Sequence, residues 1–320
     1  MKRRLLLAAM GSTALFGPHA SAAEAWPTRP VRLIVGFTPG GIVDETARLI
    51  ATHLAAHMKI TMVVENKPGV ASLLAAEHVA DSARDGHTLL LGSSSMLIAR
   101  HQLNRSTADI SRFSAISPLS NAALILVASP KFPASDPQAF VREIRANPGK
   151  YFYSTAGVGS IHHLSMEILK KQLKLDIEHV PYRGATAMLP DLVSGQVPLA
   201  VMSAGGAEEQ EKAGRLKVLG LMNPTKWSNE SSWRPMAEVA PGFGVSSTLQ
   251  LLGPAGMPNE VVQRLNNALK TILGMPEIAD HMARQGAQPK YSSSADLQAD
   301  LQLDNQRWLA LVKELNLQER

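Results

Sequence analysis

The sequence predicts an α/β protein made of two doubly wound lobes joined by a hinge of two strands, and three observations carry this prediction. Near-continuous apolar runs at residues 31–35 and 88–91 are typical of parallel strands that are covered on both faces. The first run breaks at Pro39-Gly40-Gly41, and an amphipathic helix pattern follows at once. The same strand, glycine turn and helix return about 120 residues later, at 150–168. This repetition indicates two similar α/β halves.

The first unit starts with the strand predicted at 31–35 and continues into a helix. Apolar side chains at helical spacing define the buried face of that helix: Val43, Ala47, Ile50, Leu54 and Met58. A strand–turn–helix unit of this kind directs the free N–H groups of the first helical turn beyond the edge of the sheet. These groups favour a negatively charged partner. We therefore predict an anion-binding site at Pro39-Gly40-Gly41.

The rest of the first hundred residues continues the alternation of strands and helices. A strand at 61–66 ends at Lys67-Pro68-Gly69, a helix spans 73–83, and the strand at 88–91 leads into three serines at 93–95. Ligands of doubly wound sheets bind beyond the carboxyl ends of the strands. The glycine turn after the first strand and the three serines are therefore expected at one edge of the sheet.

A second lobe is predicted after the strand at 124–127, because a proline-marked polar stretch up to Pro137 follows it and indicates a crossing. The elements predicted in this lobe are strands at 150–154, 177–180, 199–202 and 216–221, a turn at 156–160, a helix starting at Ile161 and a helix near 189–193.

The chain then returns to the first lobe. A strand at 248–252 precedes a helix capped by Asn259, and a last helix covers 294–317. Two crossings between lobes form a two-strand hinge, the usual build of a closing receptor. We assign residues 26–125 and 246–320 to the first lobe and residues 126–245 to the second.

The N-terminus has the pattern of an export signal. Met1-Lys2-Arg3-Arg4 is basic, residues 5–16 are apolar, and Ala20-Ser21-Ala22 provides a small-x-small cleavage site. The apolar core is too short to span a bilayer, which needs about 20 residues. We predict a signal peptide within residues 1–25, cleaved after Ala22 or Ala25, with the general and twin-arginine routes both open. The mature protein is expected in the periplasm.

The amino-acid composition excludes several classes of function. The chain has no cysteine, which excludes disulfides, thiol chemistry and a lipid-modified N-terminal cysteine. The formal net charge of +5 falls to +2 once Lys2, Arg3 and Arg4 leave with the signal, because 29 basic and 27 acidic residues remain. No cluster of basic residues is interleaved with aromatic ones, so a nucleic-acid partner is not expected.

Two other motifs suggest cofactor or metal sites. Gly157-Val158-Gly159 with Asp176 lacks the third glycine of a dinucleotide fingerprint, and Asp176 precedes its strand instead of ending it. His53 and His57 have the spacing of a zinc helix, but the glutamate that would act as base and a third ligand are missing. We therefore predict neither a cofactor nor a metal.

Ser160 lies beside His162 and His163, which suggests a hydrolase. Adjacency in sequence is not a triad, and no Gly-x-Ser-x-Gly elbow occurs. We expect Ser160 to cap the helix that follows and to present its hydroxyl to a ligand, while His163 either packs within the first turn or contacts that ligand. Arg183 is expected either to pair with a ligand carboxylate or to lie on a solvated rim. An exported hydrolase using Ser160 or Ser94 remains the alternative function.

Nine motifs, taken in order, relate the chain to a known family. They are Trp26-Pro27-x-Arg29-Pro30-Val31-Arg32, Phe37-x-Pro39-Gly40-Gly41-x-x-Asp44, Val64-Glu65-Asn66-Lys67-Pro68-Gly69, Asp85-Gly86-His87-Thr88-Leu89-Leu90, Gly157-x-Gly159-Ser160-x-x-His163-Leu164, Val180-Pro181-Tyr182-Arg183-Gly184, Asp191-Leu192-x-x-Gly195-Gln196, Ala213-Gly214-Arg215-Leu216 and Pro254-Ala255-Gly256-x-Pro258. With these motifs the chain resembles the periplasmic solute-binding receptors of tripartite tricarboxylate transporters, often called Bug-type receptors. The resemblance covers nearly the whole chain after Trp26.

This resemblance implies a type II periplasmic-binding fold, in which two α/β lobes close on a carboxylate ligand and a membrane permease receives it. It implies a receptor and not an enzyme, and we expect a monomer. A sensor that passes the signal to another partner is a further alternative. The candidate ligand-binding residues are Phe37, Thr38, Gly40, Gly41, Ile42, Val43, Ser93, Ser94, Ser154, Thr155, Gly159, Ser160, His163, Tyr182, Arg183 and Ser203.

Three departures from the family pattern bear on the ligand. Ile42-Val43 stand where members usually have a hydroxyl pair, and Ser203 stands where many have an aspartate that can meet a ligand amine. Thr248 replaces the usual tryptophan before the Pro-Ala-Gly turn. We therefore expect a more apolar carboxylate, aromatic or branched, in preference to citrate or aspartate.

Overall fold

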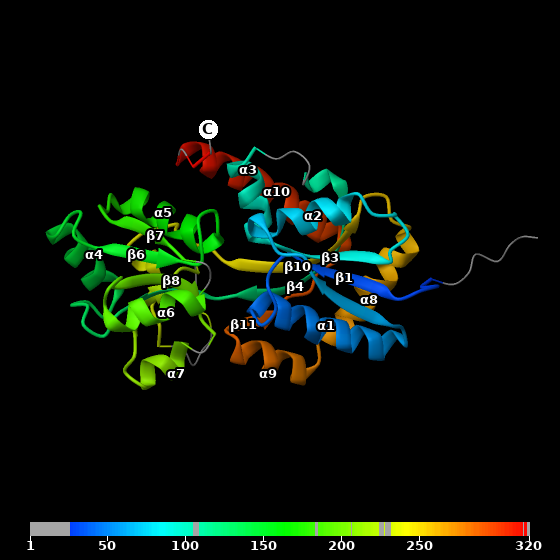
Figure 1. The fold of residues 1–320 in the computed structure, drawn as a ribbon, viewed down its shortest axis with the longest axis horizontal. Coiled ribbons are helices and arrows are strands. Elements are labelled where there is room, and N and C mark those ends of the chain that lie inside the picture. Colours follow the sequence, from blue (N-terminus) through cyan, green and yellow to red (C-terminus); the bar gives the residue numbers. More distant parts are fainter. Residues whose placement is uncertain are drawn as a thin grey trace, which may run out of the picture.

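The structure is a computed structural model that describes residues 26–104, 109–182, 185–205, 207–223, 227, 232–315 and 317–318. The predicted signal peptide therefore lies outside the described residues. Within them, two separate β-sheets with helices on their faces form two lobes placed side by side (Figure 1). We name the lobe built on the six-stranded sheet the first lobe and the one built on the five-stranded sheet the second lobe.

The first lobe contains a mixed sheet with the strand order β11-β4-β10-β3-β1-β2. Its strands are β1 (Val31–Val35), β2 (Met62–Asn66), β3 (Thr88–Ser93), β4 (Phe113–Ala122), β10 (Ser247–Pro254) and β11 (Ala287–Pro289). β1 pairs in parallel with β2 and β3, while β10 runs antiparallel to β3 and β4. The predicted buried parallel strands at 31–35 and 88–91 are thus confirmed.

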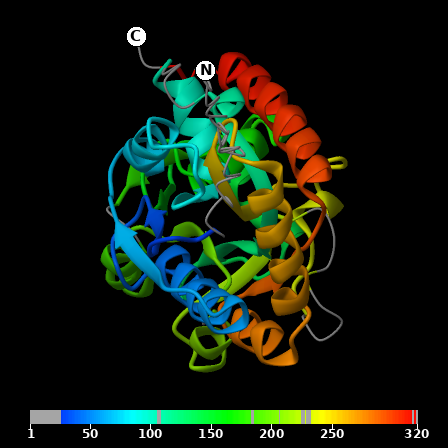
Figure 2. The ribbon, with the colours of Figure 1, turned by 90° about the vertical axis from the view of Figure 1, so that its right-hand side faces the viewer.

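Helices cover both faces of this sheet. They are α1 (Ile42–Met58), α2 (Leu73–Ala80), α3 (Ser94–Gln102), α8 (Asn259–Leu273), α9 (Pro276–Arg284) and α10 (Ser294–Glu314), with short 3-10 turns at Val70–Ser72 and Ile110–Arg112. α1 and α8 pack together, and α10 packs on α3 and β4. Figure 2 shows α1 and α10 on opposite sides of the lobe. Alternate residues of β1 therefore enter two cores, Leu33 in one and Ile34 in the other.

The second lobe contains the sheet β7-β6-β8-β5-β9. Its strands are β5 (Leu124–Ala128), β6 (Phe152–Thr155), β7 (Glu178–Pro181), β8 (Leu199–Ser203) and β9 (Lys217–Leu221), and its helices are α4 (Pro137–Ala146), α5 (Ile161–Leu173), α6 (Ala185–Ser194) and α7 (Ala207–Lys212), with a 3-10 turn at Met236–Glu238. β6 is parallel to β7 and β8, whereas β5 is antiparallel to β8 and β9. The second strand–turn–helix unit, β6 to α5, is present as predicted.

The first crossing differs from the sequence prediction. The strand at 124–127 was expected to precede the crossing, but β5 lies inside the second sheet between β8 and β9. The chain crosses earlier, after β4, a strand that the sequence analysis missed. Its serines and Pro118 hide the strand pattern, and Pro118 is tolerated where the pairing of β4 with β10 shifts register.

The start of α8 differs by one residue from the prediction, and α3 is a helix that the sequence prediction did not contain. Pro258 occupies the N-cap of α8, so Asn259 is the first helical residue and not the cap. Ser94 begins α3 instead of extending the turn after β3. In both cases a polar residue that favours caps stands one position inside the helix.

Asn223 of the second lobe holds both crossings together. Its Oδ1 accepts the N–H of Leu124 (2.9 Å), and its Nδ2 donates to Ser246 Oγ (3.0 Å), at the start of the return into β10. Figure 1 shows β4 and β10 running side by side into the space between the lobes. The two connections therefore form one hydrogen-bonded hinge.

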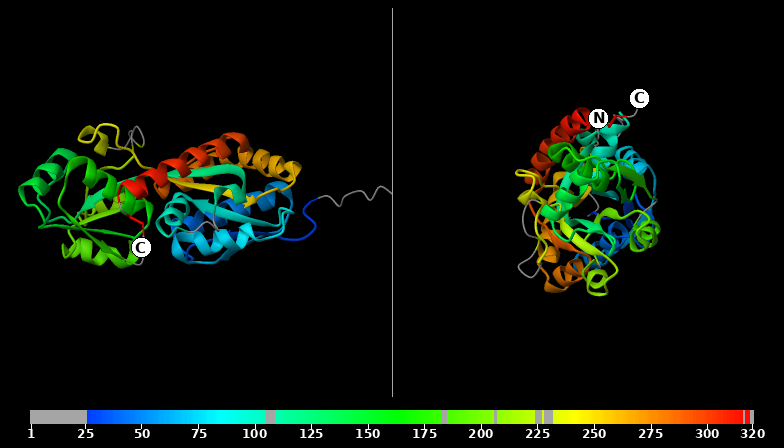
Figure 3. Two further views of the ribbon diagram at one scale, coloured as in Figure 1. Left: turned by 90° about the horizontal axis from the view of Figure 1, so that it is seen from above. Right: turned by 90° about the vertical axis from the view of Figure 1, so that its left-hand side faces the viewer.

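The last helix provides a third link between the lobes. α10 runs along the first lobe and reaches the second (Figure 3), where Lys171 Nζ of α5 lies 2.8 Å from a carboxylate oxygen of Glu314. Trp308 is buried beneath this helix. Within the described part of the chain, none of the helices is both long and apolar enough to cross a membrane.

Candidate ligand-binding site

Three helices, α1, α3 and α5, begin where the two lobes face each other (Figure 1). α1, α3 and α5 follow directly on β1, β3 and β6, so they begin beyond the carboxyl ends of these strands. The first turns of α3 and α5 are in contact, because the Ile161 N–H lies 3.5 Å from Ser95 Oγ. This edge is therefore the candidate site for a ligand shared by both lobes.

The Pro39-Gly40-Gly41 turn presents open amides at the start of α1. Gly40 has φ of 85°, a left-handed conformation that favours glycine, while Gly41 is the extended N-cap of the helix. A Cβ atom added to either glycine would meet nothing within 4 Å. Among the described residues, the N–H groups of Gly41, Ile42 and Val43 have no hydrogen-bond partner. The predicted anion-binding geometry is therefore available here.

The buried carboxylate of Asp44 holds this turn in place through hydrogen bonds. Asp44 is 2% exposed and accepts hydrogen bonds from the Gly40 N–H (3.0 Å), Arg48 Nε (2.9 Å) and Asn66 Nδ2 (2.8 Å). Asn66 also donates to the Phe37 carbonyl (3.0 Å), so both ends of the turn are held. Burial raises the pKa of Asp44, but the bonds from Arg48, Asn66 and Gly40 outweigh it and lower the pKa overall. We call Gly40, Asp44, Arg48 and Asn66 the Asp44 cluster.

Ser160 caps α5, as the sequence predicts. Its hydroxyl accepts the His163 N–H (3.2 Å) and donates to the Gly157 carbonyl (2.8 Å). Gly157 and Gly159 have positive φ of 134° and 79°, and a Cβ at Gly159 would come within 2.4 Å of Gln102 Oε1 in α3. The turn therefore needs glycine for its positive φ values, and at Gly159 it also leaves no room for a side chain next to Gln102 of the first lobe.

Replacing Ser160 with alanine is expected to lower the free energy of unfolding by about 1 kcal/mol, since an N-cap hydroxyl is lost. Chemical denaturation of the wild type, Ser160→Ala and Ser160→Asp measures this, with the aspartate variant retaining most of the stability. Equal stability of all three would contradict the capping role.

The amides of α5 are more fully bonded than those of α1. The Ser160 N–H bonds to the Gly157 carbonyl (3.3 Å), the His163 N–H to Ser160, and the Ile161 N–H to Ser95 of the first lobe. Of the N–H groups of residues 160–163, that of His162 has no partner among the described residues. The repeated strand–turn–helix unit suggests similar helix starts in the two lobes, but the structure places most free donors on the first lobe.

His163 packs inside the second lobe. Its ring stacks on His179 with centroids 4.2 Å apart, and its Nδ1 lies 3.4 Å from the Gly159 N–H. Burial lowers its pKa. Of the two roles left open for His163, the structure shows the packing role.

Ser154 and Thr155 also direct their hydroxyls into the second lobe. Ser154 Oγ donates to the Leu199 carbonyl (3.1 Å), and Thr155 Oγ1 lies 2.7 Å from His179 Nε2. Both residues are fully buried. Their side chains therefore hold β6 in place and are already engaged within the lobe.

His162 is not among the predicted ligand-binding residues, but it points toward one of them. Its Nε2 lies 3.3 Å from Ser203 Oγ at the carboxyl end of β8. His162 and His163 are neighbours in sequence, but one residue rotates a helix by about 100°, so they occupy different faces. Once Ser160 is recognised as the N-cap, helix geometry alone predicts that His162 and His163 lie on different faces of α5.

The serines after β3 take part in contacts across the site. Ser94 Oγ lies 2.8 Å from Thr248 Oγ1 and accepts the Thr248 N–H (3.1 Å), which ties α3 to β10. Ser95 meets α5 as described above, and Ser93 is buried with no partner for its hydroxyl among the described residues. These serines connect the site to the hinge.

The remaining predicted site residues are Tyr182, Arg183, Ile42 and Val43. The Tyr182 hydroxyl donates to Asp191, and this bond raises its pKa to about 12. Arg183 lies outside the described residues. Ile42 and Val43 are half-buried in the first turn of α1, and Thr38 is exposed beside them. The first turn of α1 therefore presents aliphatic side chains beside its free backbone N–H groups, while the serines after β3 add hydroxyls to the first-lobe side of the site.

The serines considered for a hydrolase contact other groups. Ser160 Oγ bonds to a carbonyl and Ser94 Oγ to Thr248, so no histidine receives a proton from either hydroxyl among the described residues. His53 of the suggested zinc helix lies 3.5 Å from Glu277. In the part of the chain that the structure describes, no three side chains are grouped as metal ligands.

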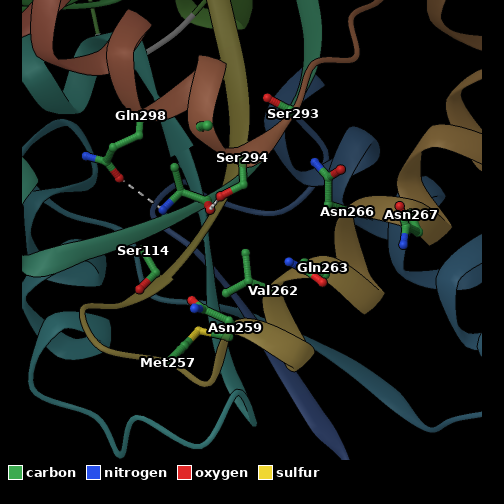
Figure 4. A pocket seen from close by; sticks show the side chains of 12 residues that line it. Ser114, Met257, Asn259, Val262, Gln263, Asn266, Asn267, Ser293, Ser294 and Gln298 are labelled. Atoms are coloured by element: carbon green, nitrogen blue, oxygen red, sulfur yellow. Dashed lines mark hydrogen bonds between the residues drawn. The ribbon is translucent and has the colours of Figure 1, made fainter.

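A separate cavity of ≈ 550 Å³ lies in the first lobe between α8 and the start of α10 (Figure 4). Its lining is uncharged and rich in amides and hydroxyls. Asn266 Nδ2 donates to the Ile116 carbonyl (2.7 Å), and Ser294 Oγ donates to the Ala115 carbonyl (2.6 Å). These bonds attach the helices to β4, so the polar groups at its base have a structural role.

Two α/β lobes with a double crossing and facing helix starts define a two-lobed solute-binding protein. The family described as "Tripartite tricarboxylate transporter family receptor" matches residues 46–317, and the chain belongs to this family. A UPF0065 protein of Bordetella pertussis is 32% identical over 321 residues, covering 99% of each chain. The resemblance predicted from the motifs is confirmed.

Solved structures agree with the predicted periplasmic-binding fold. An R. palustris protein solved with adipate has a TM-score of 0.81 at 30% identity, over 91% of this chain and 98% of that one. The periplasmic binding protein BugD has a TM-score of 0.80 at 25% identity, over 92% of this chain and 100% of that one. The fold class predicted from the sequence is therefore confirmed.

Proposed function

We propose that this chain is an extracytoplasmic receptor that captures a small organic carboxylate between its lobes and delivers it to a tripartite tricarboxylate-type permease. The observation that carries this proposal is the set of free amides at Gly41, Ile42 and Val43, held in place by the Asp44 cluster. The relative solved with adipate supports a carboxylate as the ligand. Export by a signal peptide within residues 1–25 and a monomeric state belong to the same proposal.

The available donors are sufficient for useful affinity. Hydrogen bonds to a charged group contribute about 1.5–3 kcal/mol each. Three amides at α1 and one or two donors from the second lobe can exceed association costs and approach the roughly −8 kcal/mol of a micromolar complex. Because the donors come from both lobes, the ligand favours the closed arrangement.

The ligand is proposed to be more apolar than citrate or aspartate. Ile42 and Val43 place aliphatic side chains next to the free amides, and each is half-buried. A polar chain beside them would lose hydration without gaining a partner. An aromatic or branched carboxylate would instead bury apolar area there.

The experiment that tests the function is a thermal-shift screen over carboxylates, followed by calorimetry. The best ligand is expected to raise the melting temperature, because a ligand at 100 times its dissociation constant stabilises the folded state by about 2.7 kcal/mol. Chromatography of the ligand after incubation is expected to return it unchanged. Binding of no carboxylate would refute the function, turnover lost in Ser160→Ala would favour a hydrolase, and a preference for citrate or aspartate would refute the apolar ligand alone.

A further inference from the structure

We propose that His162 is a specificity-determining residue of the second lobe, which hydrogen bonds the part of the ligand remote from the carboxylate held at α1. This inference rests on the proposed function and adds the chemistry of the ligand's other end. That end is inferred to be an uncharged hydrogen-bonding group, such as a hydroxyl or a carbonyl.

The position of His162 places it at the junction of the lobes. It is the second residue of α5, and its ring contacts Ser203, the last residue of β8. The next residue, Ala204, donates its N–H to the carbonyl of Ala123, which lies in the first crossing (3.0 Å). The imidazole is therefore next to the hinge, on the same side as the facing helix starts.

One nitrogen of this ring is left without a partner. Nε2 is paired with Ser203, whereas Nδ1 is buried and has no hydrogen-bond partner among the described residues. A neutral imidazole has one donor and one acceptor nitrogen, so either tautomer leaves a polar group unpaired. Buried polar groups are nearly always hydrogen-bonded in native proteins. A bound ligand would supply the missing bond.

The ring offers a hydrogen bond without charge. Burial lowers the pKa of His162 to about 4, and no carboxylate contributes to that shift. Its contact, Ser203, is also uncharged. Among the described residues, no negatively charged group contacts this ring to balance an ammonium group, and such a group would lose its hydration uncompensated. A hydroxyl or carbonyl avoids that cost.

The experiment starts from the aromatic or branched acid that binds best in the screen and compares three series of it by calorimetry: unsubstituted acids, ω-hydroxy acids and ω-amino acids, the last two with the added group at the end remote from the carboxylate. For the wild type, the best ω-hydroxy acid is expected to bind at least about 10-fold more tightly than the matching unsubstituted acid and the matching ω-amino acid, which corresponds to one hydrogen bond or about 1.4 kcal/mol. In His162→Leu the advantage of the hydroxyl should disappear, while His162→Gln should keep part of it.

His57→Leu serves as the matched control, because His57 is exposed near the end of α1 and lies away from the facing helix starts. Its affinities should equal those of the wild type. Melting temperatures of all variants show whether each one folds. An unchanged hydroxyl preference in folded His162→Leu, or tighter binding of the ω-amino acids by the wild type, would overturn this inference. If the wild type binds no carboxylate of the larger screen, the proposed function itself fails.

Discussion

Gly41→Phe is expected to abolish carboxylate binding while the protein still folds. Gly41 has φ of −94° and ψ of 167°, which any residue adopts, and a Cβ there would meet nothing within 4 Å. The aromatic ring would occupy the space in front of the free amides. Loss of about two hydrogen bonds to a charged ligand corresponds to at least about a 100-fold weaker affinity. Calorimetry with the best carboxylate of the screen measures this, and chemical denaturation measures the stability.

Two alanine variants provide the controls. Gly41→Ala should change neither stability nor affinity strongly, because the methyl group points into open space. Gly40→Ala should lose about 1–2 kcal/mol of stability, since a side chain at φ of 85° is strained. If Gly41→Phe binds the carboxylate as tightly as the wild type, the amides of α1 are not the binding site.

Asp44→Asn is expected to destabilise the fold and weaken ligand binding together. The asparagine NH2 group would face donors from Gly40, Arg48 and Asn66, so at least one buried donor would lose its acceptor. Such a loss costs about 1–3 kcal/mol. Because half of the Arg48 side chain is exposed, the ion pair itself adds little. Denaturation and calorimetry on the same variant test both effects.

The acid dependence of this variant has a defined sign. The pKa of Asp44 is lower in the folded chain than its ordinary value, so the charged carboxylate stabilises the fold above a pH of about 4. That stabilisation is lost as the pH falls through the folded pKa. The stability difference between wild type and Asp44→Asn should therefore shrink on acidification below pH 4.

Glu45→Gln is the matched control for charge. Glu45 lies in the same helical turn and is exposed, so its replacement removes the same charge near the helix start without opening the Asp44 cluster. The expected loss is about 0.3–1 kcal/mol. Equal effects of the two substitutions would show that charge alone, and not the buried bonds, supports the turn.

The periodic elements of the fold could be predicted from the sequence, because buried parallel strands and amphipathic helices have strong patterns. Residues 31–35 and the helix after Gly41 illustrate this. β4 was missed because Pro118 and its serines resemble a loop, although pairing with β10 and packing against α8 and α10 stabilise it. Tertiary contacts of that kind have no local signal.

The candidate site was predictable where backbone geometry defines it and less so where side chains do. The glycines of the first turn and the N-cap Ser160 could be recognised from local rules. The choice between His162 and His163 depends on which helix face meets β8, a contact between residues about 40 positions apart. Likewise, Asp44 and Asn66 belong to separate motifs, and only folding brings them within 2.8 Å.

Asn223 hydrogen bonds to both connections between the lobes, and this constrains how the lobes can move relative to each other. Since Asn223 bonds to Leu124 and to Ser246, one strand cannot slide past the other without breaking a bond. Rotation of the lobes about Asn223 keeps both bonds, so these bonds favour a hinge motion over sliding of one strand past the other. A pivot of this kind would bring the donors of the two halves back to the same positions on every cycle of capture and release.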